Sequence, residues 1–126
     1  HLKKSDTDKD YNHALNICTN NINRIAICAG THNEDSSQIL ANLLNQKGIE
    51  KNDNRIYFSQ LLGMSDHISY NLSVANYNVS KYVPYGPVKD VMPYLIRRAE
   101  ENTSIAGQMG RELTNIVAEK KRRKNL

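Results

Sequence analysis

The stretch Ile56-Tyr57-Phe58-Ser59-Gln60-Leu61-Leu62 predicts a β-strand in the middle of the chain, and Gly63 ends it. On its N-terminal side, residues 24–28 contain the apolar run Ile-Ala-Ile-Cys, which is typical of a strand buried on both faces. On its C-terminal side, residues 79–83 predict a third strand. Apolar residues at helical spacing predict helices over residues 10–21, 35–47, 65–75, 87–102 and 111–123. Asp35 or Ser36 can cap the second of these helices, and the last is expected to turn Leu113, Ile116 and Val117 inward.

This alternation of strands and helices predicts an α/β fold with parallel strands joined by right-handed crossovers. Three strands cannot close a barrel, because a complete (β/α)8 barrel takes about 250 residues. The chain is therefore either a small open sheet or a part of a barrel. In both cases ligands bind in the loops at the carboxyl ends of the strands, which here are residues 30–33, 61–66 and 82–86.

Bulk composition limits the protein to one domain at most, since the chain has 126 residues. It contains no apolar run of about 18 residues that could span a membrane. The net charge of +4 comes from a block of basic residues at 120–124, within a predicted basic helical tail over residues 118–126. We expect this tail to be a solvated helix end, and contact with nucleic acid or anionic lipid is the alternative.

The cysteines and histidines predict no metal site. Cys18 and Cys28 are ten residues apart, which is neither a metal-binding nor a redox spacing, and their apolar neighbours predict buried free thiols. This cysteine content fits a reducing compartment. We expect His13 and His67 to be structural or surface residues, because neither has a ligand partner at a suitable spacing.

The helix predicted over residues 87–102 carries the most unusual polar group of the chain. Tyr94, Arg97, Arg98 and Glu101 follow one another at i, i+3, i+4 and i+7, so they share one helix face. Two neighbouring guanidinium groups beside a tyrosine predict a clamp for a small carboxylate. A pair of arginines on a solvated helix is the alternative interpretation.

The predicted ligand loops carry further candidates. The segment Thr31-His32-Asn33 can offer amide groups and an imidazole ring to a phosphate or cofactor, or it can simply cap the next helix. Leu61 and Leu62 point to opposite faces of a strand, so one of them either lines an apolar pocket or packs in the core. The tyrosines of this region are either core residues or rings that stack on a ligand; they are Tyr77, Tyr82, Tyr85 and Tyr94.

Four ordered motifs resemble the proline dehydrogenase family, in its monofunctional form, from about Tyr11 to Arg123. They are residues 29–35 (AGTHNED), 57–64 (YFSQLLGM), 81–86 (KYVPYG) and 94–102 (YLIRRAEEN). The resemblance implies a distorted (β/α)8 barrel that binds FAD, oxidises L-proline to 1-pyrroline-5-carboxylate and passes electrons to a quinone. It also implies that residues 1–126 form the C-terminal part of that barrel, about three β/α units long.

The same resemblance implies roles for individual residues. Thr31, His32 and Glu101 match positions that contact FAD. Arg97 and Arg98 match a pair that binds the proline carboxylate. The other substrate-side matches are Tyr94, Tyr82 and Leu61. No protein nucleophile is needed, because the hydride goes to the flavin.

The resemblance implies L-proline and a quinone as partners, with no nucleic acid, and the basic tail leaves peripheral membrane association open. The implied location is the bacterial cytoplasm or inner-membrane periphery, or the mitochondrion in a eukaryote. One alternative is that the chain alone is a non-catalytic, incomplete barrel without flavin, with open sheet edges that self-associate. Another is a small module whose basic tail binds nucleic acid or membrane.

Overall fold

The computed structural model describes the backbone of residues 1, 3–104 and 106–124, and the side chains of these residues except 99, 101–112 and 115. The chain divides into two units, residues 1–83 and residues 84–126. The first unit contains all three strands of the described chain, and the second contains two helices.

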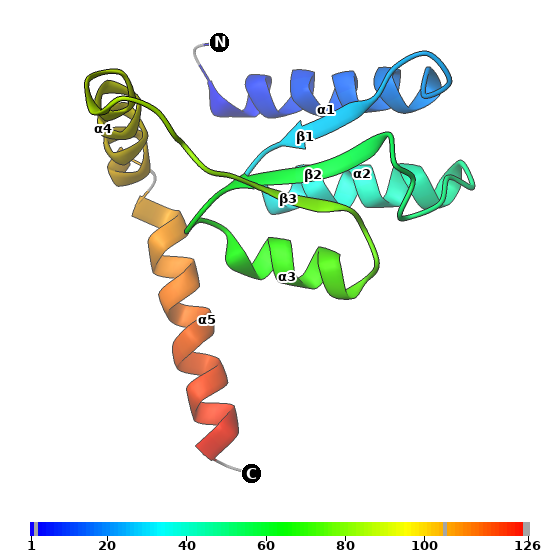
Figure 1. The fold of residues 1–126 in the computed structure, drawn as a ribbon. Helices are drawn as coiled ribbons and strands as arrows, with labels where there is room; N and C mark the ends of the chain where they lie inside the picture. The colour runs from blue at the N-terminus through cyan, green and yellow to red at the C-terminus, as the bar shows by residue number, and fades with distance from the viewer. Residues whose placement is uncertain (2, 105, 125–126) are drawn as a thin grey trace. The chain divides into compact units, whose positions relative to one another are not determined.

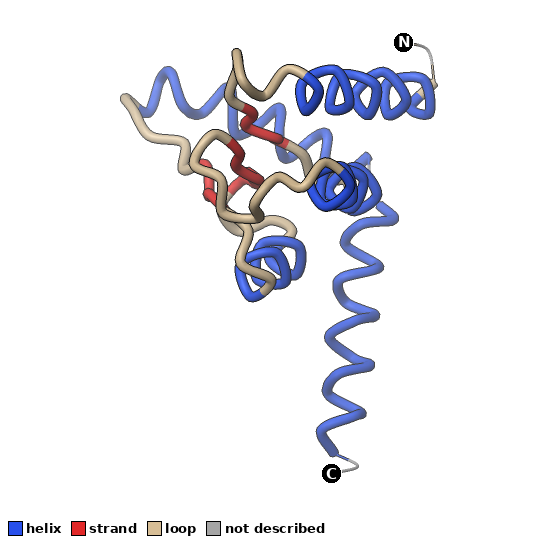
Figure 2. Tube along the Cα trace, turned by 90° about the vertical axis from the view of Figure 1, so that its right-hand side faces the viewer, coloured by secondary structure: helices blue, strands red, loops and turns tan. Residues whose placement is uncertain are grey.

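The first unit is a three-stranded parallel sheet with strand order β1-β2-β3 (Figure 1). Its register pairs Ile27 with Ile56 and Phe58 with Val79. Figure 2 shows the strands and the loops that connect them to the helices. The predicted α/β class and the three parallel β/α units are thus confirmed. The elements are α1 (Lys4–Asn20), β1 (Ile27–Gly30), α2 (Glu34–Gln46), β2 (Ile56–Leu61), α3 (Asp66–Val74) and β3 (Val79–Tyr82).

The boundaries differ from the predicted ones where polar residues decide them. Helix α1 begins at Lys4, earlier than predicted, although its first turns carry few apolar residues. Helix α2 is capped by Asn33, whose side-chain oxygen accepts hydrogen bonds from the amides of Asp35 (2.9 Å) and Ser36 (3.4 Å). Capping was the alternative interpretation of residues 31–33, and it is confirmed at Asn33. The other expected caps, Asp35 and Ser36, lie in the first turn and supply the N–H groups that the cap satisfies.

One face of the sheet is buried and the other is open. Ile27 and Ala29 in β1 are buried, whereas Cys28 between them is exposed. In β2, Phe58 is fully buried while Tyr57 is 41% exposed. Crossovers of one hand between successive strands place their helices on the same face, so the described helices of the first unit cover that face. The expectation that β1 is buried on both faces, with a buried Cys28 thiol, was therefore wrong for this chain.

The core lies between the covered face of the sheet and the helices. Phe58 of β2 packs against Leu40 and Leu44 of α2, all with no exposed surface. The ring of Tyr77 meets the Phe58 ring edge to face, with centroids 5.4 Å apart. Burying each of these large side chains contributes roughly 1.5–3 kcal/mol to folding. Tyr77 is thus a core residue, which was one of its two interpretations, and not a ring that stacks on a ligand.

The second unit consists of α4 (Val88–Ser104) and α5 (Ala106–Lys124). Helix α5 begins before Gly107 and Gly110, which were expected to precede it. Its residues Leu113, Ile116 and Val117 were expected to face inward, but they are 62%, 64% and 57% exposed. The periodic pattern had marked an apolar stripe correctly without showing what covers it. Among the described residues, no helix is long and apolar enough to cross a membrane.

Candidate functional site

The carboxyl ends of the three strands meet at one edge of the sheet. Beyond β1, the amide of Thr31 donates to the Ser59 carbonyl of β2 at 3.2 Å. Beyond β2, the amide of Leu62 donates to the Tyr82 carbonyl of β3 at 2.9 Å. These bonds extend the ladder into the loops that the sequence predicted as ligand-binding segments. Four of the eight predicted site residues, Thr31, His32, Leu61 and Tyr82, therefore lie at this edge.

Leu61 and Tyr82 are neighbours on the open face of the sheet. They are Cα partners in the parallel pairing of β2 with β3. Leu61 is half-buried and Tyr82 is 53% exposed. Tyr57 lies on the same face of β2 as Leu61, because alternate residues of a strand point the same way. The pair thus offers an apolar and an aromatic surface beside the strand ends.

Thr31 and His32 are held by hydrogen bonds from their own loop and from the neighbouring strand. The Thr31 hydroxyl oxygen accepts from the Asn33 amide at 3.0 Å, and the Thr31 carbonyl accepts from Gln60 Nε2 at 3.3 Å. His32 Nδ1 lies 2.9 Å from the Ser65 hydroxyl oxygen. Both side chains are half-buried, so each keeps a surface that a ligand can reach.

The sequence interpretation missed Gln60, which is 2% exposed on the covered face of β2. Its amide group donates to Thr31, and its side-chain oxygen accepts from the Ser69 hydroxyl at 2.8 Å. A buried amide needs such partners, because leaving it unsatisfied costs about 1–3 kcal/mol. The available signal was the alternation Ile56, Phe58, Gln60, which places a polar residue at a core position.

The loop between β2 and α3 contains two residues in the left-handed region, Gly63 (φ 79°) and Ser65 (φ 51°). Ser65 is only 5% exposed. Beside it, Lys81 Nζ donates to the Met64 carbonyl at 2.7 Å and to Asp66 Oδ1 at 2.8 Å. These contacts fix the path of the loop at the carboxyl end of β2.

A second contact joins the starts of α2 and α3. His67 Nε2 lies 2.6 Å from Glu34 Oε1, so the histidine expected to be structural has a carboxylate partner from 33 residues away. His13, by contrast, is exposed on α1. In the part of the chain that the structure describes, no three His, Cys, Asp or Glu side chains gather as a metal site.

Helix α4 carries the other predicted site residues. The Arg98 guanidinium carbon lies 5.5 Å from the centroid of the Tyr94 ring, so these two residues share a helix face as predicted. Arg97 is exposed next to them. Glu101 lies within the α4 backbone range, but its side chain is outside the described residues. A stacked arginine beside a second guanidinium can bind a carboxylate through several charge-assisted hydrogen bonds.

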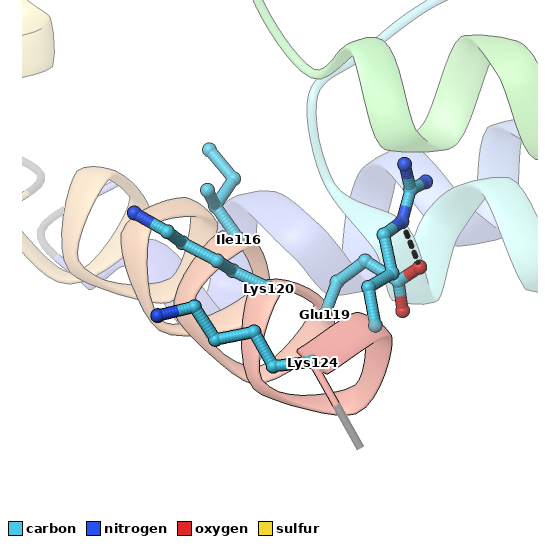
Figure 3. Close-up of a pocket in the computed structure, with 5 residues that line it drawn as sticks. Ile116, Glu119, Lys120 and Lys124 are labelled. Carbon is cyan, nitrogen blue, oxygen red and sulfur yellow. Dashed lines mark hydrogen bonds and ion pairs between the residues drawn. The ribbon is translucent and has the colours of Figure 1, made fainter. Parts of the chain in front are cut away.

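A pocket lies along the C-terminal half of α5 (Figure 3). In this view Lys120 and Lys124 extend to the same side of the helix. Glu119 accepts hydrogen bonds from Arg122 (2.7 Å) and Arg123 (2.8 Å), and these lower the pKa of its carboxyl to about 2. The described lining residues include none of the predicted site residues; they are Ile116, Glu119, Lys120, Arg123 and Lys124.

Three parallel β/α units with polar loops at the carboxyl ends of the strands define an α/β protein whose ligand site is expected at that edge of the sheet. The sequence model of the family described as "Proline dehydrogenase" matches residues 1–111. The chain therefore belongs to the proline dehydrogenase family, whose members are generally flavin-dependent. The resemblance drawn from the four motifs is confirmed.

Individual relatives agree with this family. "Proline dehydrogenase 1, mitochondrial" is 42% identical in Dictyostelium discoideum, over 94% of this chain and 22% of the relative. The Bos taurus protein of the same name is 45% identical, over 79% of this chain and 17% of the relative. "Hydroxyproline dehydrogenase" of Xenopus laevis is 40% identical, over 86% of this chain and 23% of the relative. The chain thus spans about a fifth of the length of these curated relatives.

A solved structure shows the same fold. Proline utilization A (PutA) from Bdellovibrio bacteriovorus, inactivated by N-propargylglycine, superposes with a TM-score of 0.74 at 27% sequence identity. The match covers 82% of this chain and 11% of that protein. The three parallel β/α units therefore correspond to part of the barrel of that protein, as the fold prediction required.

Proposed function

We propose that the protein that contains this chain oxidises L-proline to 1-pyrroline-5-carboxylate with FAD and passes the electrons to a quinone. The observation that carries this proposal is the match of residues 1–111 to the proline dehydrogenase family. The face shared by Tyr94 and Arg98 on α4 supports it, because it suits the anionic end of an amino acid. The chain would form the C-terminal part of the barrel, with residues 118–126 as a basic helical tail.

The residues at the sheet edge fit a flavin. The Thr31 hydroxyl oxygen accepts from the Asn33 amide, so its own hydrogen can be donated to a polar edge of a cofactor. His32 lies beside it, and both are half-buried at the carboxyl end of β1, where barrels bind ligands. We assign Thr31, His32 and Glu101 to FAD. When bound, the flavin supplies the acceptor for the hydride that leaves the substrate.

The remaining predicted residues would bind and orient the substrate. Arg97 and Arg98 would hold the proline carboxylate, and the Tyr94 ring would support the Arg98 guanidinium. Leu61 and Tyr82, paired on the open face of the sheet, would provide an apolar wall against the ring carbons of proline. Such a wall excludes water and fixes the orientation of the reacting carbon.

The test is the kinetics of arginine variants of the full-length protein. Arg97→Met and Arg98→Met keep an unbranched, flexible side chain and remove the charged guanidinium group. Each should raise KM for proline about 10- to 100-fold, because a hydrogen bond to a charged group is worth roughly 1.5–3 kcal/mol. Lys89→Met, an exposed change on the same helix, should leave KM unchanged. An unchanged KM in both arginine variants would contradict the assignment of Arg97 and Arg98 to the proline carboxylate.

The chain by itself is a separate question, since an incomplete barrel without flavin remains the alternative for it. The discriminating measurement is colour. The full-length protein should be yellow, with flavin absorbance near roughly 450 nm. If the isolated chain is colourless and does not change the spectrum of added FAD, then activity belongs to the longer protein alone.

We infer a mitochondrial location with peripheral membrane contact. The relatives named above from Dictyostelium and Bos carry "mitochondrial" in their names, and a quinone acceptor dissolves in a membrane. Exposed Leu113, Ile116 and Val117 precede the exposed basic residues 120–124 on α5, a combination that suits an anionic lipid surface. Binding to vesicles with anionic lipid that weakens with salt would support this inference, whereas equal binding to duplex DNA would favour the nucleic-acid alternative.

A further inference from the structure

We propose that Ser65 is a positioning residue that holds the His32 imidazole in the orientation required to contact the flavin. This inference rests on the proposed function, which assigns His32 to the cofactor. Ser65 itself matches none of the positions that the family resemblance assigned. It follows β2, whereas His32 follows β1, 33 residues earlier in the chain.

The geometry of the pair carries the argument. His32 Nδ1 lies 2.9 Å from the Ser65 hydroxyl oxygen, and the serine is 5% exposed. Because Nδ1 is engaged by Ser65, the ring is held with Nε2 directed away from that serine. A hydrogen bond at one ring nitrogen fixes the direction of the other, as it does for histidines that bind metals. The serine hydroxyl can donate or accept, so it suits either tautomer of the ring.

The hydroxyl of Ser65 is not used to cap α3. Ser65 occupies the N-cap position of this helix, yet its side chain makes no capping hydrogen bond. A serine at an N-cap ordinarily accepts from an amide of the first turn. Here the side chain contacts His32 instead, so its hydroxyl stabilises a residue outside the helix.

The serine is fixed in turn by a chain of hydrogen bonds that returns to the same loop. The Ser65 carbonyl accepts from the Ser69 amide at 3.2 Å. The Ser69 hydroxyl donates to Gln60 Oε1 at 2.8 Å, and Gln60 Nε2 donates to the Thr31 carbonyl at 3.3 Å. Thr31 and His32 are adjacent, so the chain of bonds closes on itself. A closed buried arrangement of this kind restricts side chains to one geometry.

The backbone of Ser65 provides a discriminating variant. With φ 51° and ψ 42°, the residue adopts the left-handed conformation, which glycine adopts without strain. Ser65→Gly therefore suits the turn better than serine does, while it removes the hydroxyl. If Ser65 is only a turn residue, glycine will serve equally well. If it positions His32, the glycine variant will be stable but will bind flavin more weakly.

The experiment measures FAD affinity of the full-length protein, freed of flavin and titrated with FAD, by fluorescence and visible circular dichroism. We expect Ser65→Gly to weaken FAD binding about fivefold, as expected for one lost hydrogen bond, without lowering the thermal midpoint. His32→Ala should weaken binding at least as much. In the double variant, Ser65→Gly should add nothing to His32→Ala, because the two residues act as a unit. Ser73→Ala, an exposed change on α3, is the control.

The possible failures are distinguishable. If His32→Ala leaves FAD affinity unchanged, the assignment of His32 to the flavin fails, and this inference fails with it. If His32→Ala weakens binding but Ser65→Gly does not, only the role of Ser65 is overturned. An equal effect of Ser65→Gly with and without His32 would also overturn it, since the serine would then act by another route.

Discussion

Leu61 and Tyr82 face the same side of the sheet as direct partners at the carboxyl ends of β2 and β3. Parallel pairing puts their Cβ atoms next to each other, and the strands end there, so both side chains border the ligand loops. The two residues are 21 positions apart in sequence, yet each had been singled out by its own motif. Their adjacency makes a single apolar wall from two separate predictions.

This wall predicts the effect of removing its aromatic half. Tyr82→Ser in the full-length protein should raise KM for proline about tenfold, because losing an apolar contact in a substrate pocket typically costs 1–3 kcal/mol. The control is Tyr70→Ser, because that ring is 69% exposed on α3. Steady-state kinetics at varied proline concentration measure both variants. Equal changes in KM for the two would contradict a role of Tyr82 at the substrate.

The stacking of Arg98 on Tyr94 predicts a graded series at position 94. Tyr94→Phe keeps the ring face and should leave KM for proline nearly unchanged. Tyr94→Leu removes it and should raise KM about two- to fivefold, since an exposed cation–π contact is worth roughly 0.5–1 kcal/mol. If Tyr94→Phe raises KM for proline as much as Tyr94→Leu does, the cation–π contact is not responsible, and the effect comes from the tyrosine hydroxyl.

The buried amide of Gln60 predicts a loss of stability when it is replaced by an apolar side chain. Gln60→Leu is close in volume but leaves the Thr31 carbonyl and the Ser69 hydroxyl without this partner. We expect a destabilisation of roughly 1–3 kcal/mol, measured as a lower denaturant midpoint in urea. Gln38→Leu, on the exposed face of α2, should change stability by less than about 0.5 kcal/mol. Similar losses for both variants would contradict the network.

The ion pair between Asp53 and Arg55 predicts a dependence of stability on pH. Arg55 Nη2 donates to Asp53 Oδ2 at 2.5 Å, and hydrogen bonds from Arg55 lower the carboxyl pKa from 3.8 to about 2. A carboxyl whose folded pKa is lowered stabilises the fold above the unfolded pKa, and this contribution is lost as pH falls from about 4 towards 2.

The measurement is the thermal midpoint between pH 5 and pH 2. Asp53→Asn should lower the midpoint slightly at pH 5 and should decline less steeply than the wild type below pH 4. The expected difference is small, because a partly exposed ion pair is screened by solvent. Glu50→Gln, an exposed change in the same loop, should follow the wild-type curve. Parallel curves for Asp53→Asn and the wild type would rule out this contribution.

Local patterns were sufficient to predict the strands, the order of elements and the position of the loops at the carboxyl ends of the strands. The alternation in Ile56 to Leu61 and the turn at Gly63 act within a few residues, so a sequence shows them directly. The shared face of Tyr94 and Arg98 likewise follows from the helix repeat.

Features that depend on distant partners were not predictable in this way. The contact of His32 with Ser65 and that of His67 with Glu34 each join residues 33 positions apart. The exposure of Cys28 and Ile116 was missed for a related reason. An apolar side chain is suited to burial, but the residues that would cover it come from distant parts of the chain or from another chain, and local sequence does not identify them.

The outer strands of the described sheet, β1 and β3, can each pair with a further strand. An outer strand presents backbone N–H and C=O groups that can form hydrogen bonds with an added strand. A parallel strand added there would continue the register of the existing sheet. A separately expressed polypeptide that supplies the adjoining strands could dock on these outer strands and assemble a two-piece protein. The sheet order therefore suits this chain to be one of the two pieces in such a complementation experiment.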